Sequence, residues 1–171
     1  RGVRLGHGVL VPDARKILDD PLIDIVIELI GGHNPARGFV LDAIAHGKDV
    51  VTANKALLAV HGEEIFAAAE RAGVGIGFEA SVGGGIPIIR TLREALAGDR
   101  NRAVYGIVNG TSNYILSRMT NEGGEFAEAL ADAQRSGFAE ADPSFDVDGT
   151  DAAHKLALLI QLAFGARVNF A

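Results

Sequence analysis

Lys155 is the residue of this sequence best placed to do chemistry. On a helical period of 3.6 residues it shares a face with Asp151, one turn earlier, and with the apolar Leu158 and Leu159, one turn later. Burial lowers the pKa of an ammonium group, so a lysine on such a face could exchange a proton near neutral pH. The pattern therefore indicates a catalytic acid or base with Asp151 as its partner.

A purely structural interpretation fits the same residues. Asp148 would cap the helix, and Asp151 would lie in the first turn, where the helix dipole favours a negative charge. Lys155 would then be an ordinary partner of Asp151 at a spacing of four residues, as on many solvated helix faces. The helix taken alone leaves both interpretations open.

A second candidate feature is the run of three glycines from Gly83 to Gly85. It could be only a flexible turn before a helix expected over 88–97. Consecutive glycines followed by a proline, here Pro87 in the first helical turn, also allow the backbone to approach a ligand or an ion closely. We prefer this second interpretation.

The elements that must position these residues change along the chain. The first half alternates apolar runs with amphipathic stretches, which is typical of βα units around a parallel sheet. The expected elements are a buried strand over 23–30, a helix that Asn34 caps, Pro35 opens and Gly47 ends, a strand over 49–52, a helix over 63–72 and a strand over 75–80.

Beyond the glycines the pattern becomes α+β. The expected elements are the helix over 88–97, a strand over 103–108, helices over 112–118 and 125–136, the Lys155 helix and the beginning of a strand over 167–170. The fold class is thus α/β, with part of a doubly wound, Rossmann-like parallel sheet in residues 1–82. An α+β domain for substrate binding and dimerisation would follow in residues 83–171.

Composition narrows the function further. The 171 residues could form one domain, or parts of two domains cut from a longer protein, because the sequence begins at Arg1 and stops directly after an apolar helix. No cysteine is present, which excludes disulfides and thiolate metal sites and fits the cytoplasm. A net charge of −6 without a basic cluster argues against nucleic acid, the apolar runs are too short for a membrane, and no signal peptide is visible.

Six motifs in order make this sequence similar to the homoserine dehydrogenases, which interconvert L-aspartate 4-semialdehyde and L-homoserine with NAD or NADP. The motifs are DIVIELIGG at 24–32, VTANK at 51–55, FEASVGGGIP at 78–87, VNGTSNYIL at 108–116, GFAEADP at 137–143 and DVDGTDAAHK at 146–155. The resemblance extends over essentially the whole chain. It implies an oxidoreductase of threonine, methionine and isoleucine biosynthesis, dimeric through its substrate domain.

The resemblance also assigns roles to individual residues. Lys155 matches the catalytic lysine, and Asp151 and Glu140 match the acids that hold the amino group and hydroxyl region of homoserine. Asp146 is similar to a further acid near the same site, although a role in orienting its loop would explain it equally well. The cofactor-binding positions implied by the family are Lys55, which follows a strand end, and Gly31, Ser81 and Gly137 at the nicotinamide.

Two further sites follow from the same resemblance. The glycine segment matches a loop that binds a monovalent cation such as sodium, with Glu79 and the carbonyl groups of Val82, Gly84 and Ile86 as ligands. The segment 109–113 begins a helix and could hold the substrate carboxylate, although capping alone explains its hydroxyl residues.

One departure from the family is large. The family begins with a strand, a G-x-G-x-x-G loop and a helix, whereas residues 1–20 contain no such motif and the glycines of 2–8 are too loosely placed to replace it. We therefore expect this chain alone to bind dinucleotide poorly. A non-catalytic fragment that binds a ligand or partner is one alternative, and another amino-acid dehydrogenase is a second. The preference between NAD and NADP and the oligomeric state stay open.

Overall fold

The computed structural model describes residue 6, residues 9–168 and residue 170. The chain divides into two units, residues 1–80 and residues 81–171. Each unit is described by itself, and the assignment of nucleotide binding to 1–82 and of substrate binding to 83–171 stays a prediction. Apart from Gly6, the glycines of segment 2–8 lie outside the described residues.

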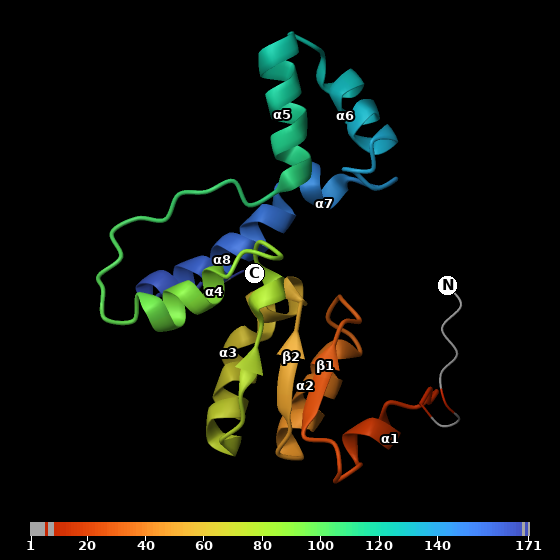
Figure 1. Ribbon diagram of the computed structural model, residues 1–171, viewed down its shortest axis with the longest axis vertical. Helices are drawn as coiled ribbons and strands as arrows, with labels where there is room; N and C mark the ends of the chain where they lie inside the picture. Colours follow the sequence, from red (N-terminus) through yellow and green to blue (C-terminus); the bar gives the residue numbers. More distant parts are fainter. Residues whose placement is uncertain (1–5, 7–8, 169, 171) are drawn as a thin grey trace. The chain divides into compact units, whose positions relative to one another are not determined.

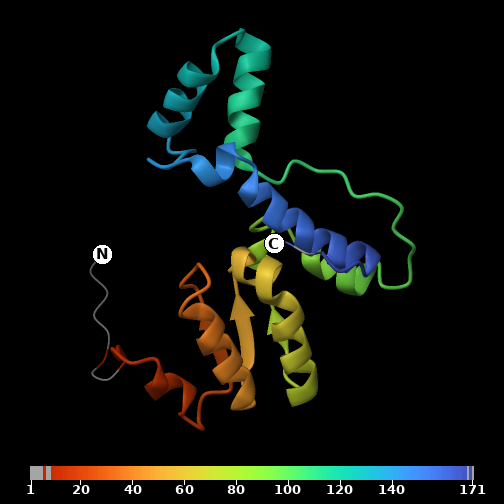
Figure 2. The same cartoon turned by 180° about the vertical axis from the view of Figure 1, so that it is seen from behind.

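Unit 1 is built on three parallel strands in the order β1-β2-β3, with bounds Ile25–Glu28, Asp49–Thr52 and Ile76–Gly77. Parallel neighbours need a crossover connection, and helices α2 (Ala36–Ala45) and α3 (Lys55–Ala72) provide the two crossovers. Figures 1 and 2 show both helices on the same face of the sheet. The βα order expected from the apolar periodicity is confirmed.

The sheet of unit 1 is buried on one face only. Val50 and Ile76 face the helices and are buried, whereas Ile25 and Ile27 on the opposite face are 55% and 65% exposed. The expectation of a buried strand over 23–30 is therefore wrong in two respects. The strand is shorter than the apolar run, and α2 and α3 both cover the same side of it.

Helix starts in unit 1 differ from the expected ones. A short helix, α1 (Arg15–Leu18), precedes the sheet and buries Leu18. Helix α3 begins eight residues before the expected position 63, since the side chain of Asn54 accepts a hydrogen bond from the Leu57 amide at 3.1 Å. At α2 the cap position is Pro35 rather than Asn34. Small shifts of this kind are common at helix ends.

The regular secondary structure in the described part of unit 2 consists of helices alone. After a 3₁₀ turn at Glu79–Ser81 its elements are α4 (Ile88–Arg90), the π-helical segment η2 (Thr91–Ala95), α5 (Gly110–Glu122), α6 (Phe126–Arg135), α7 (Ser144–Val147) and α8 (Thr150–Phe164). Helices α5 and α6 lie side by side and run in opposite directions (Figure 1). Ile115, Ala129, Ala133 and Ala139 form the core between them. The small alanines allow the two helices to approach closely.

The expected strand over 103–108 is wrong. Residues 101–109 have no regular secondary structure, and Tyr105 and Ile107 are 93% and 76% exposed. A strand needs a neighbour to satisfy its backbone groups, and the described part of unit 2 holds no second strand. Residues 165–168, where another strand was expected to begin, are irregular as well, and residue 169 lies outside the described residues.

The expected helix over 88–97 forms but changes character. After one α-helical turn it continues as the π-helical η2. The hydroxyl of Thr91 donates a hydrogen bond to the Pro87 carbonyl at 2.6 Å, and the Thr91 amide donates to the same oxygen at 3.1 Å. Such back-bonding by threonine bends helices, which accounts for the irregularity here.

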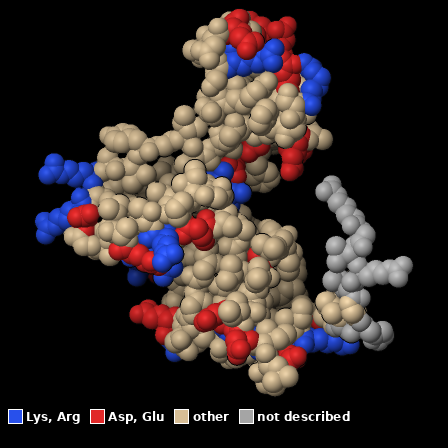
Figure 3. Space-filling view, in the orientation of Figure 1, with Lys and Arg blue, Asp and Glu red and all other residues tan. Residues whose placement is uncertain are grey.

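Neither a patch of one charge sign, on the face drawn in Figure 3, nor a helix able to span a membrane is found among the described residues. Basic and acidic side chains are interspersed on the face drawn in Figure 3. Among the residues that the structure describes, no helix combines the length and apolar content that crossing a bilayer requires.

Candidate active site

The helix that carries Lys155 begins at a glycine. Gly149 occupies the cap position of α8 with φ of 85°, a left-handed conformation that favours glycine. Asp148, expected as the cap, instead accepts a hydrogen bond from the Thr150 amide at 2.8 Å. The turn therefore ends α7 and starts α8 within three residues, which places Asp151 in the first turn of α8 and Lys155 one turn later.

The Lys155 ammonium is held by two oxygens. It donates hydrogen bonds to Asp151 Oδ2 at 2.6 Å and to the carbonyl of Val108 at 2.7 Å. The two side chains are only 17% and 12% exposed. This pair thus differs from the solvated surface pairs of ordinary helices, because water is largely excluded from both charges. The interpretation as an exposed i,i+4 pair does not describe it.

Asn109 joins two carboxylates of this cluster. Its Nδ2 donates to Asp146 Oδ1 at 2.7 Å and to Asp151 Oδ2 at 2.8 Å, while its Oδ1 accepts from the Ser112 amide at 2.7 Å and caps α5. The residue is only 6% exposed. Sequence reasoning predicted a helix start in segment 109–113 but missed the bridge. A capping asparagine uses only its oxygen, so the unassigned amide group was a signal that could have revealed it.

A pocket of about 340 Å³ adjoins this cluster through Asp146. Its polar lining comes from Glu140, Asp142 and Asp146, and Phe138 and Phe145 supply apolar surface. Hydrogen bonds from the hydroxyl and the amide of Ser144 lower the pKa of Asp142, so this carboxyl stays charged over a wider pH range. A pocket with this lining suits a small ligand that carries a positive charge.

The remaining predicted residues of the second half also line this pocket. Gly137 ends the turn after α6 with φ of 77°, and Glu140 is exposed toward the pocket wall. The side chain of Gln134 donates to the carbonyl of Glu140 at 3.1 Å, and Thr111 donates to that of Phe138 at 2.7 Å. The structure thus brings Lys155, Asp151 and Asp146 together through hydrogen bonds, while Glu140 and Gly137 share a pocket with Asp146.

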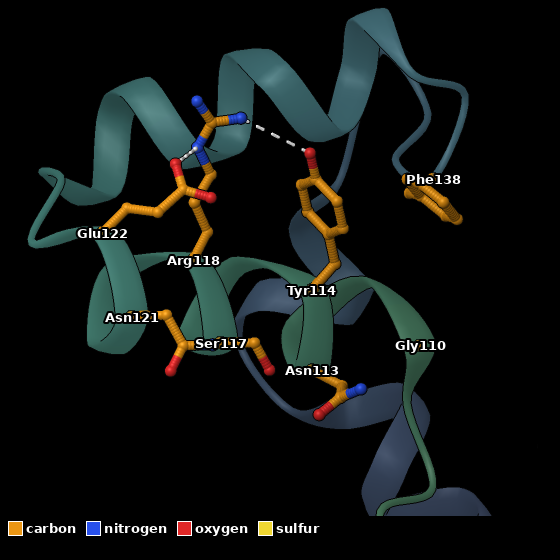
Figure 4. Close-up of a pocket in the computed structure, with 8 residues that line it drawn as sticks. All are labelled: Gly110, Asn113, Tyr114, Ser117, Arg118, Asn121, Glu122 and Phe138. Carbon is orange, nitrogen blue, oxygen red and sulfur yellow. Dashed lines mark hydrogen bonds and ion pairs between the residues drawn. The ribbon is translucent and has the colours of Figure 1, made fainter.

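A second and larger pocket in unit 2 contains none of the predicted acids or cofactor-binding residues, although Gly110 and Asn113 of the segment predicted to hold the substrate carboxylate line it. It measures about 480 Å³ and is drawn in Figure 4, with α5 and Phe138 as its walls. Its one basic side chain, Arg118, forms ion pairs with Glu122 at 3.3 Å and with Asp132 and contacts the Tyr114 hydroxyl at 3.4 Å. Since its charge is already compensated, the acidic pocket beside Lys155 is the better candidate for chemistry.

Unit 1 places two predicted cofactor residues at the carboxyl edge of its sheet. Gly31 follows β1 and Lys55 opens α3 after β2. The side-chain nitrogen Nδ2 of Asn54 donates a hydrogen bond to the Gly32 carbonyl at 2.7 Å, which ties the loop after β1 to the start of α3. This edge is where open α/β sheets bind ligands.

Sequence reasoning missed the buried residue that shapes this edge, Glu28. It is 4% exposed, and its carboxylate accepts hydrogen bonds from the amides of Ile30 at 2.7 Å and Gly31 at 3.2 Å and from the Thr52 hydroxyl at 2.6 Å. A charged residue inside an apolar strand run was the signal. Buried carboxylates need such donors, and here they fix the loop.

The glycine segment forms a tight turn. Gly83 and Gly85 have φ of 63° and 84°, and the Ile86 amide donates to the Gly83 carbonyl at 2.8 Å. Ser81 is buried. Of the predicted cation ligands, Glu79 belongs to unit 1, and Val82, Gly84 and Ile86 belong to unit 2. Among described residues, no group of three or more histidine, aspartate or glutamate side chains is placed to hold a metal ion.

Two family models match the sequence, and together they cover all of it except residues 80–86. The model described as homoserine dehydrogenase matches residues 87–171, and the model described as homoserine dehydrogenase, NAD binding domain, matches residues 1–79. The homoserine dehydrogenase of Synechocystis is 56% identical over 99% of this chain and 39% of its own length. That of Bacillus subtilis is 50% identical over the same shares. This chain therefore spans about two fifths of the length of these relatives.

Solved structures agree with this match. The homoserine dehydrogenase of Thiobacillus denitrificans superposes with a TM-score of 0.87 at 58% identity, over 90% of this chain and 36% of that one. A hyperthermophilic archaeal homoserine dehydrogenase in complex with NADPH superposes with a TM-score of 0.83 at 31% identity, over 91% of this chain and 48% of that one. With both family models matched in sequence order, the chain belongs to the homoserine dehydrogenase family.

Proposed function

We propose that this chain carries the substrate-binding and proton-transfer residues of a homoserine dehydrogenase. The reaction interconverts L-aspartate 4-semialdehyde and L-homoserine with NADP or NAD, in the biosynthesis of threonine, methionine and isoleucine. One observation carries the proposal: the ammonium of Lys155 is largely shielded from water, held by Asp151 and Val108, and connected to an acidic pocket. This is the environment that an acid/base group of a reductase needs.

Lys155 acts on the oxygen of the reacting carbonyl. Hydride addition to an aldehyde builds negative charge on this oxygen, which an ammonium within hydrogen-bond reach stabilises and then protonates. In the reverse direction the neutral amine of Lys155 takes the proton from the hydroxyl of homoserine. Asp151 orients the amine through its hydrogen bond of 2.6 Å. Nothing else in the described cluster can donate a proton so directly to a bound oxygen.

The acidic pocket binds the ammonium group of the substrate. Glu140 and Asp146 line it, and Asp151 lies next to Asp146 across the Asn109 bridge. A hydrogen bond to a charged group contributes about 1.5–3 kcal/mol, so each carboxylate that contacts the ammonium group would add appreciably to the binding free energy of a small amino acid. Glu140, Asp146 and Asp151 are therefore the proposed substrate-binding residues.

A nicotinamide dinucleotide, which supplies the hydride when bound, fits the carboxyl edge of unit 1. Gly31 and Gly32 have positive φ, and beyond their chain neighbours no heavy atom lies within 4 Å of the places where their Cβ atoms would stand. The loop is therefore open to a ligand. Lys55, at the start of α3, would contact the cofactor, and Ser81 and Gly137 would meet its nicotinamide end. The NADPH complex of the archaeal relative favours NADP.

We further propose that the segment from Glu79 to Ile86 holds sodium or a similar monovalent cation. Gly83 and Gly85 have left-handed backbone conformations, which let this segment turn tightly, and hard cations prefer the oxygen ligands that its carbonyl groups and Glu79 could supply. Activity of the full-length protein should then rise with added sodium. Indifference to sodium and potassium, with no ion in a high-resolution map of the loop, would contradict this.

The proposed assembly is a homodimer formed through unit 2. The proposed location is the cytoplasm, because a chain without cysteine forms no disulfides and so suits a reducing compartment. The segment around Tyr105 and Ile107 supports the dimer, because it has the composition of a strand and exposes both side chains. Sedimentation of the full-length protein should give twice the protomer mass, and replacing both residues with serine should lower it. A monomeric wild type would contradict the assembly.

Replacement of Lys155 tests the proposed reaction. General acid/base help is worth about a hundredfold to ten-thousandfold, so Lys155→Ala in the full-length protein should lower kcat for homoserine oxidation by that order. Lys16→Ala, at an exposed position of α1, is the matched control and should leave kcat unchanged. Wild-type kcat in Lys155→Ala would overturn the proposal and leave the non-catalytic binding fragment as the better account.

A further inference from the structure

We propose that Asn109 is a positioning residue, which holds the substrate-binding carboxylate of Asp146 and the Lys155 partner Asp151 at a fixed separation. The inference rests on the proposed function, because it concerns the same cluster. It adds a residue whose own side chain touches neither reacting atom. Its side-chain amide links Asp146, in the pocket wall, to Asp151, the partner of Lys155.

The orientation of the Asn109 amide is determined by its surroundings. A backbone N–H can only donate, so the atom that meets the Ser112 amide at 2.7 Å must be the oxygen Oδ1. The nitrogen Nδ2 must then face the carboxylates of Asp146 and Asp151, to which its two N–H groups donate at 2.7 and 2.8 Å. A flipped amide would put three oxygens together and leave the helix cap unmade.

The Asn109 bridge reduces the repulsion between two neighbouring carboxylates. Asp146 and Asp151 are like charges in a poorly hydrated cluster, and Lys155 compensates only one of them. A neutral amide with two donors can satisfy both carboxylates without adding a charge, which neither a lysine nor a hydroxyl could do. The hydroxyl of Ser112 donates to the Asp146 carbonyl at 2.8 Å and keeps α7 against the start of α5.

The connection also sets where Lys155 points. Asp151 Oδ2 accepts hydrogen bonds from both Asn109 and Lys155, so the position of this one oxygen fixes the ammonium relative to the pocket wall at Asp146. Misplacement of a catalytic group by about 1 Å can cost about a hundredfold in rate. Loss of the bridge should consequently lower kcat more than it raises KM.

Two substitutions separate the bridge from the cap. Serine is a good helix cap but lacks the amide, so Asn109→Ser keeps the first function and loses the second, whereas Asn109→Ala loses both. In the full-length protein Asn109→Ser should have a melting temperature close to wild type, kcat about tenfold to a hundredfold lower, and a KM for homoserine within about threefold of wild type. Asn109→Ala should lose the same kcat and in addition melt earlier.

The same substitution elsewhere in unit 2 is the control. Asn101 donates one hydrogen bond of 3.2 Å to the Ala163 carbonyl and lies outside the cluster, so Asn101→Ser should keep wild-type kcat. Wild-type kcat in Asn109→Ser would show that Asn109 is only a cap and would overturn the inference. If Lys155→Ala keeps its activity, the proposed function itself fails. If Lys155→Ala is inactive and Asn109→Ser is normal, only the inference fails.

A measurement on the wild type needs no variant and covers the case in which Asn109→Ser does not fold. With asparagine labelled with ¹⁵N, the bridge predicts one side-chain amide of which both protons exchange slowly with water, because both donate to shielded carboxylates. If every asparagine side chain had at least one proton that exchanged at the solvent rate, the bridge would be absent.

Discussion

Two asparagines open helices in the two units and use the same side chain differently. Asn54 caps α3 and Asn109 caps α5, each by accepting a hydrogen bond from the amide three residues later. The nitrogen of Asn54 donates to the backbone carbonyl of Gly32, whereas that of Asn109 donates to Asp146 and Asp151. The first ties a loop to a helix and contributes stability. The second arranges charged groups and is expected to contribute to turnover.

Two carboxylates, Glu28 in unit 1 and Asp151 in unit 2, show a similar difference between a structural and a proposed catalytic environment. Glu28 in unit 1 accepts all of its hydrogen bonds from neutral donors, two amides and a hydroxyl, and it is almost completely buried. Asp151 in unit 2 accepts from the ammonium of Lys155 and remains partly open to solvent. A carboxylate whose partners are all neutral serves to hold the surrounding backbone in place. A carboxylate paired with a lysine can also stabilise the charged form of that lysine when the lysine gains or loses a proton.

Among the replacements of carboxylate and capping residues, the largest effect on kcat/KM is expected from the acids of unit 2. Asp151→Ala and Glu140→Ala should each lower kcat/KM for homoserine roughly tenfold to 150-fold, the value of about 1.5–3 kcal/mol for a hydrogen bond to a charged group. Of these two variants, only Asp151→Ala should also lower kcat strongly, because the Asp151 side chain, unlike that of Glu140, holds Lys155. Steady-state kinetics of the full-length protein measure both constants. Asp99→Ala, at an exposed position, serves as control, and equal kinetics of all three variants would contradict the assignment.

Glu28→Ala should act on stability. The substitution leaves the amides of Ile30 and Gly31 and the hydroxyl of Thr52 without their acceptor, and an unsatisfied buried donor costs about 1–3 kcal/mol. Urea unfolding of this chain should show that loss. Glu70→Ala, on an exposed part of α3, should change the unfolding free energy little. Equal stability of the two variants would mean that Glu28 does not hold the loop.

The cap alone can be isolated at Asn54. Asn54→Ala should cost about 1 kcal/mol of unfolding free energy, and Asn54→Ser should recover most of it, because serine replaces the capping oxygen. The small remainder is the hydrogen bond to the Gly32 carbonyl. Thermal unfolding of the three proteins gives both values. Asn54 and Asn109 would be equivalent, and the contrast between them wrong, if serine also restored the turnover of Asn109→Ala.

The sequence predicted the contact between Lys155 and Asp151 better than the strands of unit 2, for physical reasons. The Lys155–Asp151 pair follows from helical spacing, a local property, and the structure confirms their contact. The strand over 103–108 was predicted from composition, but strands depend on partners that a local pattern does not reveal. The segment 109–113 was predicted to begin a helix because capping is local. The bridge joins Asn109 to residues 37 and 42 positions away, and the local sequence does not specify such distant partners.

The smallest effect is expected at His61 in unit 1, where the free energy of unfolding should depend on pH. Burial lowers the pKa of His61, and the charges of Arg37 and His33 lower it further, while Glu64 raises it. The folded state thus favours neutral His61, and stability present above the unfolded pKa of about 6.5 is lost as the pH falls through the lower folded value. Urea unfolding between pH 8 and about 5 should be less pH-dependent in His61→Gln than in wild type. Parallel profiles would exclude this role.

The direct test of the central claim is a crystal structure of the full-length protein with bound homoserine. Lys155 Nζ should lie within about 2.6–3.2 Å of the homoserine hydroxyl oxygen, with the ligand's ammonium group on Glu140 and Asp146 and with Asn109 still between Asp146 and Asp151. Homoserine bound with its hydroxyl on another side chain, and Nζ still engaged only by Asp151 and the Val108 carbonyl, would contradict the account.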